Sequence, residues 1–140
     1  SYQSLSFMDY GLWRQMLEAN LIAPFHIAVE FKRNPVRIER PLIVNMASGL
    51  ASITENTHGM SHAYRSSKAG LNMLTKGMAA EWQNIIVISM SPGWCKTDLG
   101  GDLADVEPAD SVHAQQRTYE ALTIADSGRF IDRFGGAVPW

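Results

Sequence analysis

The chain has 140 residues, a formal net charge of −2 and a hydrophobic content of 46%, which predicts one folded domain over residues 1–140 with a hydrophobic core. The scattered charges argue against a nucleic-acid-binding protein that depends on a basic stripe, and a single cysteine, Cys95, excludes an internal disulfide and a multi-cysteine metal site. No apolar run is long enough to cross a membrane and no secretory signal is visible, so we expect a cytoplasmic protein.

Residues 9–31 carry apolar side chains at nearly helical spacing, which predicts one long helix with Asp9 as its N-cap. Pro24 lies inside this helix and has no backbone N–H, so it cannot donate to the carbonyl of Asn20. We therefore expect a local bend that leaves the Asn20 carbonyl free, although an ordinary kinked surface helix shows the same pattern. A polar connector is expected over residues 32–40.

Two short apolar runs, residues 42–46 and 85–90, are typical of buried strands. Between them, residues 49–60 predict a loop and residues 61–82 predict a helix rich in small side chains. The order strand, helix, strand predicts a parallel pair joined by a right-handed crossover.

The rest of the chain continues the alternation of helices and strands. Residues 97–106 predict an irregular segment, residues 108–122 a helix that begins at Pro108, and residues 128–131 a short last strand. We therefore predict an α/β fold, a partial Rossmann-like parallel sheet of about three strands with flanking helices.

Three residues whose side chains could act on one substrate oxygen are expected at one end of this predicted sheet. Ligands bind beyond the carboxyl ends of parallel strands, and Ser48 follows the end of the first predicted strand. Tyr64 and Lys68 are four residues apart, so they share one face of the helix that begins near the same edge. A fixed ammonium favours the phenolate of a neighbouring phenol, which makes Tyr64 a candidate general acid-base, and Ser48 could hold the same substrate oxygen.

Several segments together carry a family resemblance. NMAS, AYRSSKAG and SPGWCKTDLGG, in this order, resemble the carboxyl-terminal half of short-chain dehydrogenase/reductases, in particular the C-factor-like group of small bacterial oxidoreductases. The closing GRFIDRFGGAVPW resembles the tail of that group, so the resemblance covers essentially the whole sequence. A tyrosine and a lysine at this spacing occur by chance on many helices, whereas the ordered set of segments is specific.

The resemblance implies catalytic roles for four residues. Tyr64 would be the general acid-base, and Ser48 would orient the substrate carbonyl. Lys68 would bind the nicotinamide ribose hydroxyls and favour the phenolate of Tyr64. Asn20 matches the helix asparagine whose backbone carbonyl holds a relay water in this family, at the position where Pro24 is expected to free a carbonyl.

The resemblance also implies NAD or NADP as the cofactor, bound in part by Tyr64 and Lys68. Four further residues would contact it in the loop after the second strand. Pro92 and Gly93 would line the nicotinamide, the backbone of Cys95 would lie near its carboxamide, and Thr97 would contact the carboxamide or a phosphate.

No metal site is expected. His58 and His62 are four residues apart, a spacing that binds zinc when both histidines lie on one helix. Gly59 lies between them near a loop boundary, and no third ligand is evident.

The family's cofactor cradle does not occur in this sequence, which contains neither TGxxxGxG nor GxGxxG. Because backbone amides at that turn hold the pyrophosphate, we expect weak NAD(P) binding. The strand at residues 42–46 would also lack its usual neighbour, and an unpaired apolar edge favours self-association or a partner chain.

We therefore predict an oxidoreductase that interconverts a small-molecule carbonyl and alcohol with NAD(P). The alternative is a catalytically silent truncated fragment or interaction module that keeps the motif without the cradle. A third reading makes the chain one part of a two-chain enzyme whose cradle is supplied in trans. No nucleic-acid or membrane partner is expected, and the substrate and the choice between NAD and NADP stay open.

Overall fold

A three-stranded parallel sheet forms the centre of the fold in the computed structural model, which describes residues 3–34 and 38–140. Its strands, in spatial order, are β1 (Leu42–Met46), β2 (Ile86–Ser91) and β3 (Phe130–Asp132). The sheet confirms the predicted fold class. Within the described residues, β1 pairs only with β2, so its other edge is open, as predicted.

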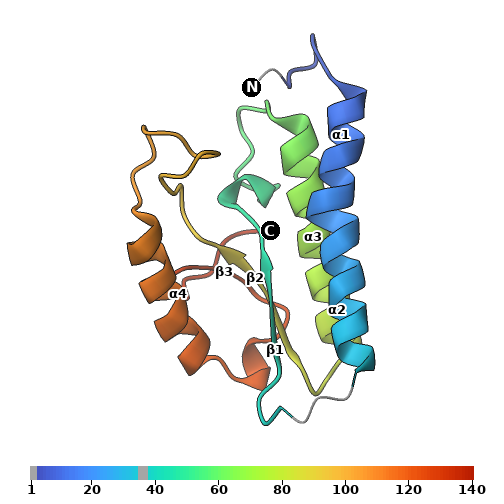
Figure 1. Cartoon of the computed structure of the whole chain (residues 1–140), viewed down its shortest axis with the longest axis vertical. Helices are drawn as coiled ribbons and strands as arrows, with labels where there is room; N and C mark the ends of the chain where they lie inside the picture. Colours follow the sequence, from blue (N-terminus) through green and yellow to red (C-terminus); the bar gives the residue numbers. More distant parts are fainter. Residues whose placement is uncertain (1–2, 35–37) are drawn as a thin grey trace.

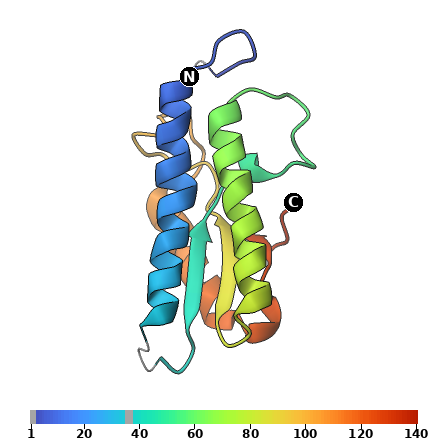
Figure 2. The ribbon, with the colours of Figure 1, turned by 90° about the vertical axis from the view of Figure 1, so that its right-hand side faces the viewer.

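Helices cover both faces of the sheet (Figure 1). One face carries α3 (His62–Glu81) and, beside it, a continuous rod made of α1 (Tyr10–Leu17), the π-helical turn η1 (Glu18–Ile22) and α2 (Ala23–Arg33). Figure 2 shows this rod and α3 side by side in front of the strands, while α4 (Pro108–Ala121) packs on the opposite face. None of the described helices is long and apolar enough to span a bilayer.

Alternation along the strands divides the apolar side chains between two clusters. On the α3 face, Ile43 and Val87 pack with Met78. On the α4 face, Val44 and Ile88 belong to a second cluster, which includes Leu122 and Tyr119. Because apolar surface is removed from water on both faces of the sheet, β1 and β2 are apolar runs rather than alternating patterns.

The helix predicted over residues 9–31 is present, and it is interrupted where Pro24 predicted an irregularity. Asp9 caps its start by accepting hydrogen bonds from the backbone N–H groups of Gly11 and Leu12 at 2.9 and 3.0 Å. In the π-helical turn, the N–H of Ala23 donates to the carbonyl of Glu18, five residues back. The sequence predicted the place of the interruption but not that it is a π turn.

The other predicted elements agree with the structure within a few residues. The predicted loop 49–60 contains one short 3₁₀ turn, η2 (Gly49–Ala51), and a second one, η3 (Ile124–Asp126), precedes β3. The last strand starts two residues later than predicted, because Gly128 takes a left-handed turn with φ of 82°. The predicted connector 32–40 lies partly outside the described residues, and its first two residues still belong to α2.

A buried polar cluster ties α3 to the sheet. The Thr75 hydroxyl accepts hydrogen bonds from Asn45 Nδ2 at 2.8 Å and from Ser89 Oγ at 2.9 Å, and it donates to the carbonyl of Leu71 at 2.9 Å. Asn45 and Ser89 are register partners in β1 and β2. Because each side chain has a partner, the cluster fixes the height of α3 over the strands at little cost in desolvation.

Candidate active site

The first turn of α3 is capped by a residue far away in the sequence. Ser61, at the N-cap position, has a left-handed backbone with φ of 50° and makes no side-chain cap. Instead, the buried side chain of Gln3 accepts hydrogen bonds from the N–H groups of Ala63 at 3.1 Å and Tyr64 at 3.3 Å. The backbone of Tyr64 is therefore held by the amino-terminal segment, a contact across 61 residues that local sequence patterns do not reveal.

Tyr64 and Lys68 lie together at the carboxyl end of β1. Lys68 Nζ is 5.9 Å from the centre of the Tyr64 ring and donates a 2.8 Å hydrogen bond to the carbonyl of Met46, the last residue of β1. Partial burial lowers the pKa of the Lys68 ammonium below its usual value. The two side chains remain half-buried, so the phenol and the ammonium are both within reach of a ligand.

Ser48 lies two residues after the end of β1, where the Met46 carbonyl accepts the hydrogen bond from Lys68. Its backbone is extended, and its Oγ accepts a 3.2 Å hydrogen bond from the N–H of Leu50. That bond leaves the Ser48 hydroxyl hydrogen without an acceptor among residues 3–34 and 38–140. A Cβ at Gly49 would lie 3.8 Å from Ser91 Oγ, so the loops that leave β1 and β2 are adjacent. The structure thus brings Ser48, Tyr64 and Lys68 to one end of the sheet.

Asn20 is linked to Tyr64 through its side chain. Asn20 Nδ2 donates to Ser67 Oγ at 3.1 Å, and Ser67 Oγ donates to the carbonyl of Tyr64 at 2.8 Å. This connection joins the π-helical turn to the first turn of α3. The prediction concerned the backbone carbonyl of Asn20, and its role in holding a water stays a prediction.

The loop after β2 is held by contacts with the chain that follows it, at Val106 and Ser111. Pro92 directly follows the strand, and its carbonyl accepts a 2.7 Å hydrogen bond from Ser111 Oγ. Gly93 has φ of 88°, a conformation that favours glycine. Cys95 is bridged to Val106, and its Sγ lies 3.7 Å from the Pro92 carbonyl oxygen.

Thr97 is exposed in the same loop and accepts a 3.1 Å hydrogen bond from the N–H of Gly100. Between this loop and Tyr64 or Lys68, the described part of the chain has no hydrogen bond. The cofactor contacts assigned to Pro92, Gly93, Cys95 and Thr97 therefore stay predictions.

The two histidines at zinc-binding spacing are not on one helix. His58 Nδ1 lies 2.8 Å from the hydroxyl oxygen of Thr57 in the loop, whereas His62 is the first residue of α3. Gly59, with φ of 68°, turns the chain between them.

Comparisons with known proteins point to one protein family. A family model for short chain dehydrogenase matches residues 2–108. C-signal from Myxococcus xanthus is 30% identical over 139 residues, which cover 98% of this chain and 84% of that protein. The 1-hydroxy-2-glutathionyl-2-methyl-3-butene dehydrogenase of Rhodococcus sp. (strain AD45) is 28% identical over 139 residues, 95% of this chain and 61% of that protein.

Solved structures show the same fold over the whole chain. The carbonyl reductase Sniffer of D. melanogaster superposes with a TM-score of 0.89 at 28% identity, and an NADPH bound carbonyl reductase from chicken fatty liver with a TM-score of 0.90 at 27% identity. Each match covers 100% of this chain and 62% of the other, so the chain spans less than two thirds of these reductases.

Proposed function

We propose that this chain, which belongs to the short-chain dehydrogenase family, takes part in the NAD(P)-dependent interconversion of a carbonyl and an alcohol. The observation that carries the proposal is the position of Lys68, bound to the end of β1 and 5.9 Å from the Tyr64 ring centre, with Ser48 two residues beyond that strand end. The chemistry named in the relatives, a dehydrogenase and an NADPH bound carbonyl reductase, supports the same reaction class.

Tyr64 would move the proton. In the reducing direction its hydroxyl would give a proton to the carbonyl oxygen, and the hydride to the carbonyl carbon would come from a bound dihydronicotinamide. In the reverse direction the phenolate would take the alcohol proton, and the hydride from the alcohol carbon would pass to the oxidised nicotinamide. Ser48 would donate its free hydroxyl hydrogen to the same oxygen and orient it for transfer.

Lys68 has the donors that a nicotinamide ribose needs. An ammonium has three N–H bonds, and one of them is used on the Met46 carbonyl, which leaves two for ribose hydroxyls. Pro92, Gly93, Cys95 and Thr97 would line the nicotinamide and carboxamide side, and Asn20 would connect the site to a relay water. The donor set of this chain thus fits the reactive end of the cofactor, while residues 1–140 contain no glycine-rich turn for its pyrophosphate.

Two structural proposals accompany this function. Residues 1–140 would form one domain that corresponds to the carboxyl-terminal part of a family member, with NAD or NADP binding weaker than in a chain that carries the glycine-rich turn. The open edge of β1 would be covered by a second copy or a partner chain, since a parallel strand with a free apolar edge favours pairing.

The test compares the parent chain with Tyr64→Phe. NADH and NADPH binding is first measured by fluorescence titration, and reduction of 4-nitrobenzaldehyde is then followed with the dinucleotide that binds. Removal of the hydroxyl should lower the rate at least about 100-fold, the usual contribution of a general acid, with little change in dinucleotide affinity.

Tyr119→Phe is the matched control, because it removes a phenol hydroxyl on the other face of the sheet, and its rate should equal the parent rate. Parent activity that survives in Tyr64→Phe would remove Tyr64 from the mechanism. A parent chain that binds neither dinucleotide would favour the catalytically silent alternative.

A further inference from the structure

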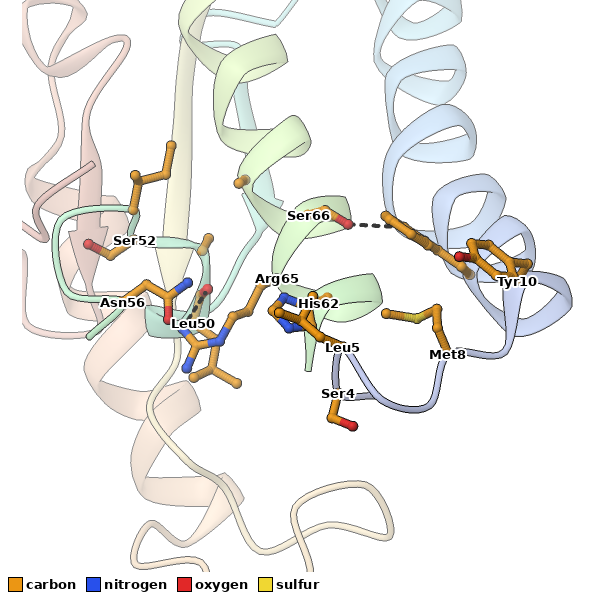
Figure 3. Close-up of a pocket in the computed structure, with 14 residues that line it drawn as sticks. Ser4, Leu5, Met8, Tyr10, Leu50, Ser52, Asn56, His62, Arg65 and Ser66 are labelled. Atoms are coloured by element: carbon orange, nitrogen blue, oxygen red, sulfur yellow. Dashed lines mark hydrogen bonds between the residues drawn. The ribbon is translucent and has the colours of Figure 1, made fainter. Parts of the chain in front are cut away.

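A pocket separate from the candidate active site lies on the outer face of α3, the helix that carries Tyr64. It has a volume of about 440 Å³ and is formed by the amino-terminal segment, the loop after η2 and the first turns of α3 (Figure 3). None of Ser48, Tyr64 and Lys68 lines it. Its volume falls within the range of pockets that hold small molecules, about 300–1,000 Å³.

The walls of this pocket are mainly apolar. Tyr10 and Trp13 stack with ring centres 6.2 Å apart, and Ile53 also lines the pocket. Leu5 and Ile53 are 92% and 77% exposed, so apolar surface at the rim is in contact with water. Covering such surface with an apolar ligand is favourable by about 25 cal/mol per Å².

A single strong cation faces this apolar space. Arg65 Nε donates to the carbonyl of Met60 at 3.1 Å, and one terminal nitrogen donates to the carbonyl of Leu50 at 3.4 Å. No lining residue is an aspartate or glutamate, and within the described ranges no carboxylate lies within salt-bridge distance of Arg65. The guanidinium therefore keeps N–H bonds for an anion, and no nearby carboxylate competes for it.

The pocket is held in shape before any ligand binds. Trp13 Nε1 donates to Ser66 Oγ at 3.0 Å (the dashed line at Ser66 in Figure 3), which fixes the indole. Gly59, Met60 and Ser61 all have left-handed backbones, and this tight turn presents the Met60 carbonyl to Arg65. A preorganised site loses less conformational freedom on binding, so it binds more tightly.

We propose that this pocket binds a small organic anion, a carboxylate on an apolar body, with Arg65 holding the carboxylate and the aromatic side chains of Tyr10 and Trp13 covering the body. The charge selects the ligand, because an apolar groove alone would not distinguish a carboxylate from the matching alcohol. The proposal does not depend on the reaction at Tyr64.

The test uses 4-phenylbutanoate as the probe and 4-phenylbutan-1-ol as its uncharged counterpart. Isothermal titration calorimetry on the full chain should show saturable binding of the acid, and the alcohol should bind at least about tenfold more weakly. The indole N–H resonance of Trp13, assigned with Trp13→Phe, should shift during the titration with the acid.

Two variants separate the charge from the shape of the pocket. Arg65→Met should weaken binding of the acid at least about tenfold, but it also removes the bonds to Met60 and Leu50. Asn56→Asp avoids that problem, because the side-chain oxygen that accepts from the Gly59 N–H at 3.0 Å is kept. Figure 3 shows Asn56 beside Arg65, so the new carboxylate should weaken binding of the acid and leave binding of the alcohol unchanged.

Arg117→Met changes an exposed side chain of α4, makes the same change in net charge as Arg65→Met and should bind the acid like the parent. Equal affinity for acid and alcohol, or equal weakening by Arg117→Met, would overturn the proposal. So would a dimer in sedimentation that Trp13→Phe weakens, together with no binding of the acid, since the pocket would then be an interface between copies.

Discussion

The two halves of α3 are held in place by different forces. In the first two turns, residues 62–69, long polar side chains make bonds to distant backbone: Gln3 caps the helix, Lys68 bonds to the end of β1 and Arg65 bonds to η2. In the later turns, residues 71–81, the side chains of Leu71 and Met78 are buried. The Thr75 hydroxyl accepts hydrogen bonds from two strand side chains, Asn45 and Ser89.

The later turns of α3 therefore contribute mainly to stability, whereas the first turns carry the side chains that can bind a ligand. Side chains that hold the first turns through backbone carbonyls stay half-exposed and keep spare hydrogen-bonding groups, as Lys68 and Arg65 do. The buried polar side chains of the later turns have hydrogen-bond partners, with one exception: the buried amide of Asn72 has no partner among the described residues. Substitutions in the later turns should therefore change stability first, and those in the early turns should change local order or titration.

The largest effect on stability is expected for Thr75→Val. The valine keeps the shape but leaves the amide of Asn45 buried without its partner, which should lower the free energy of unfolding by about 1–3 kcal/mol in urea denaturation. Thr75→Ser keeps the hydroxyl and is the matched control. If Thr75→Ser were as destabilising as Thr75→Val, packing of the methyl group and not the polar cluster would hold the later turns.

A smaller and more local effect is expected for Gln3→Leu. This change removes the acceptor for the Ala63 and Tyr64 N–H groups and should cost about 1 kcal/mol, as the loss of a helix cap usually does. Amide hydrogen exchange should become faster at Ala63 and Tyr64, while the amide of Thr75 changes less. Gln3→Glu keeps an acceptor at the helix start and should exchange like the parent, and uniform acceleration along α3 would contradict the division into two halves.

The elements and the positions of Tyr64 and Lys68 were predictable because their signals are local. The apolar runs that became β1 and β2 and the missing N–H of Pro24 all act over a few residues. The clustering of Tyr64 and Lys68 at the end of β1 followed from helical spacing and strand order, and the structure confirms it through the bond from Lys68 to Met46.

The remaining contacts depend on chain positions that only the folded structure brings together. The cap from Gln3 to Tyr64 spans 61 residues, and the pocket at Arg65 needs the amino-terminal segment and the loop after η2 at once. The polar cluster did leave a signal, because Asn45 and Ser89 interrupt two apolar runs at partner positions. Polar residues inside predicted buried strands are therefore worth pairing before a structure is known.

The smallest effect concerns the pH dependence contributed by Lys68, the charge on the boundary between the two halves. Burial lowers its pKa from 10.5, so between the lowered pKa and 10.5 the unfolded chain binds more protons than the folded chain. The free energy of unfolding contributed by Lys68 therefore rises with pH through that interval and levels off above it. Neither Lys68→Met nor Lys68→Arg titrates there, so the parent should gain stability relative to both variants as the pH rises from below the lowered pKa to 10.5. Burial raises the pKa of Tyr119 to about 12 and makes stability fall with pH above 10.0, but all three chains share this contribution and it cancels in the difference. The stability that the parent gains over the Lys68 variants should be modest because the half-exposed ammonium is screened by solvent. In urea denaturation, a stability difference between parent and variants that does not change with pH would show that Lys68 is as well solvated as the charges on the surface.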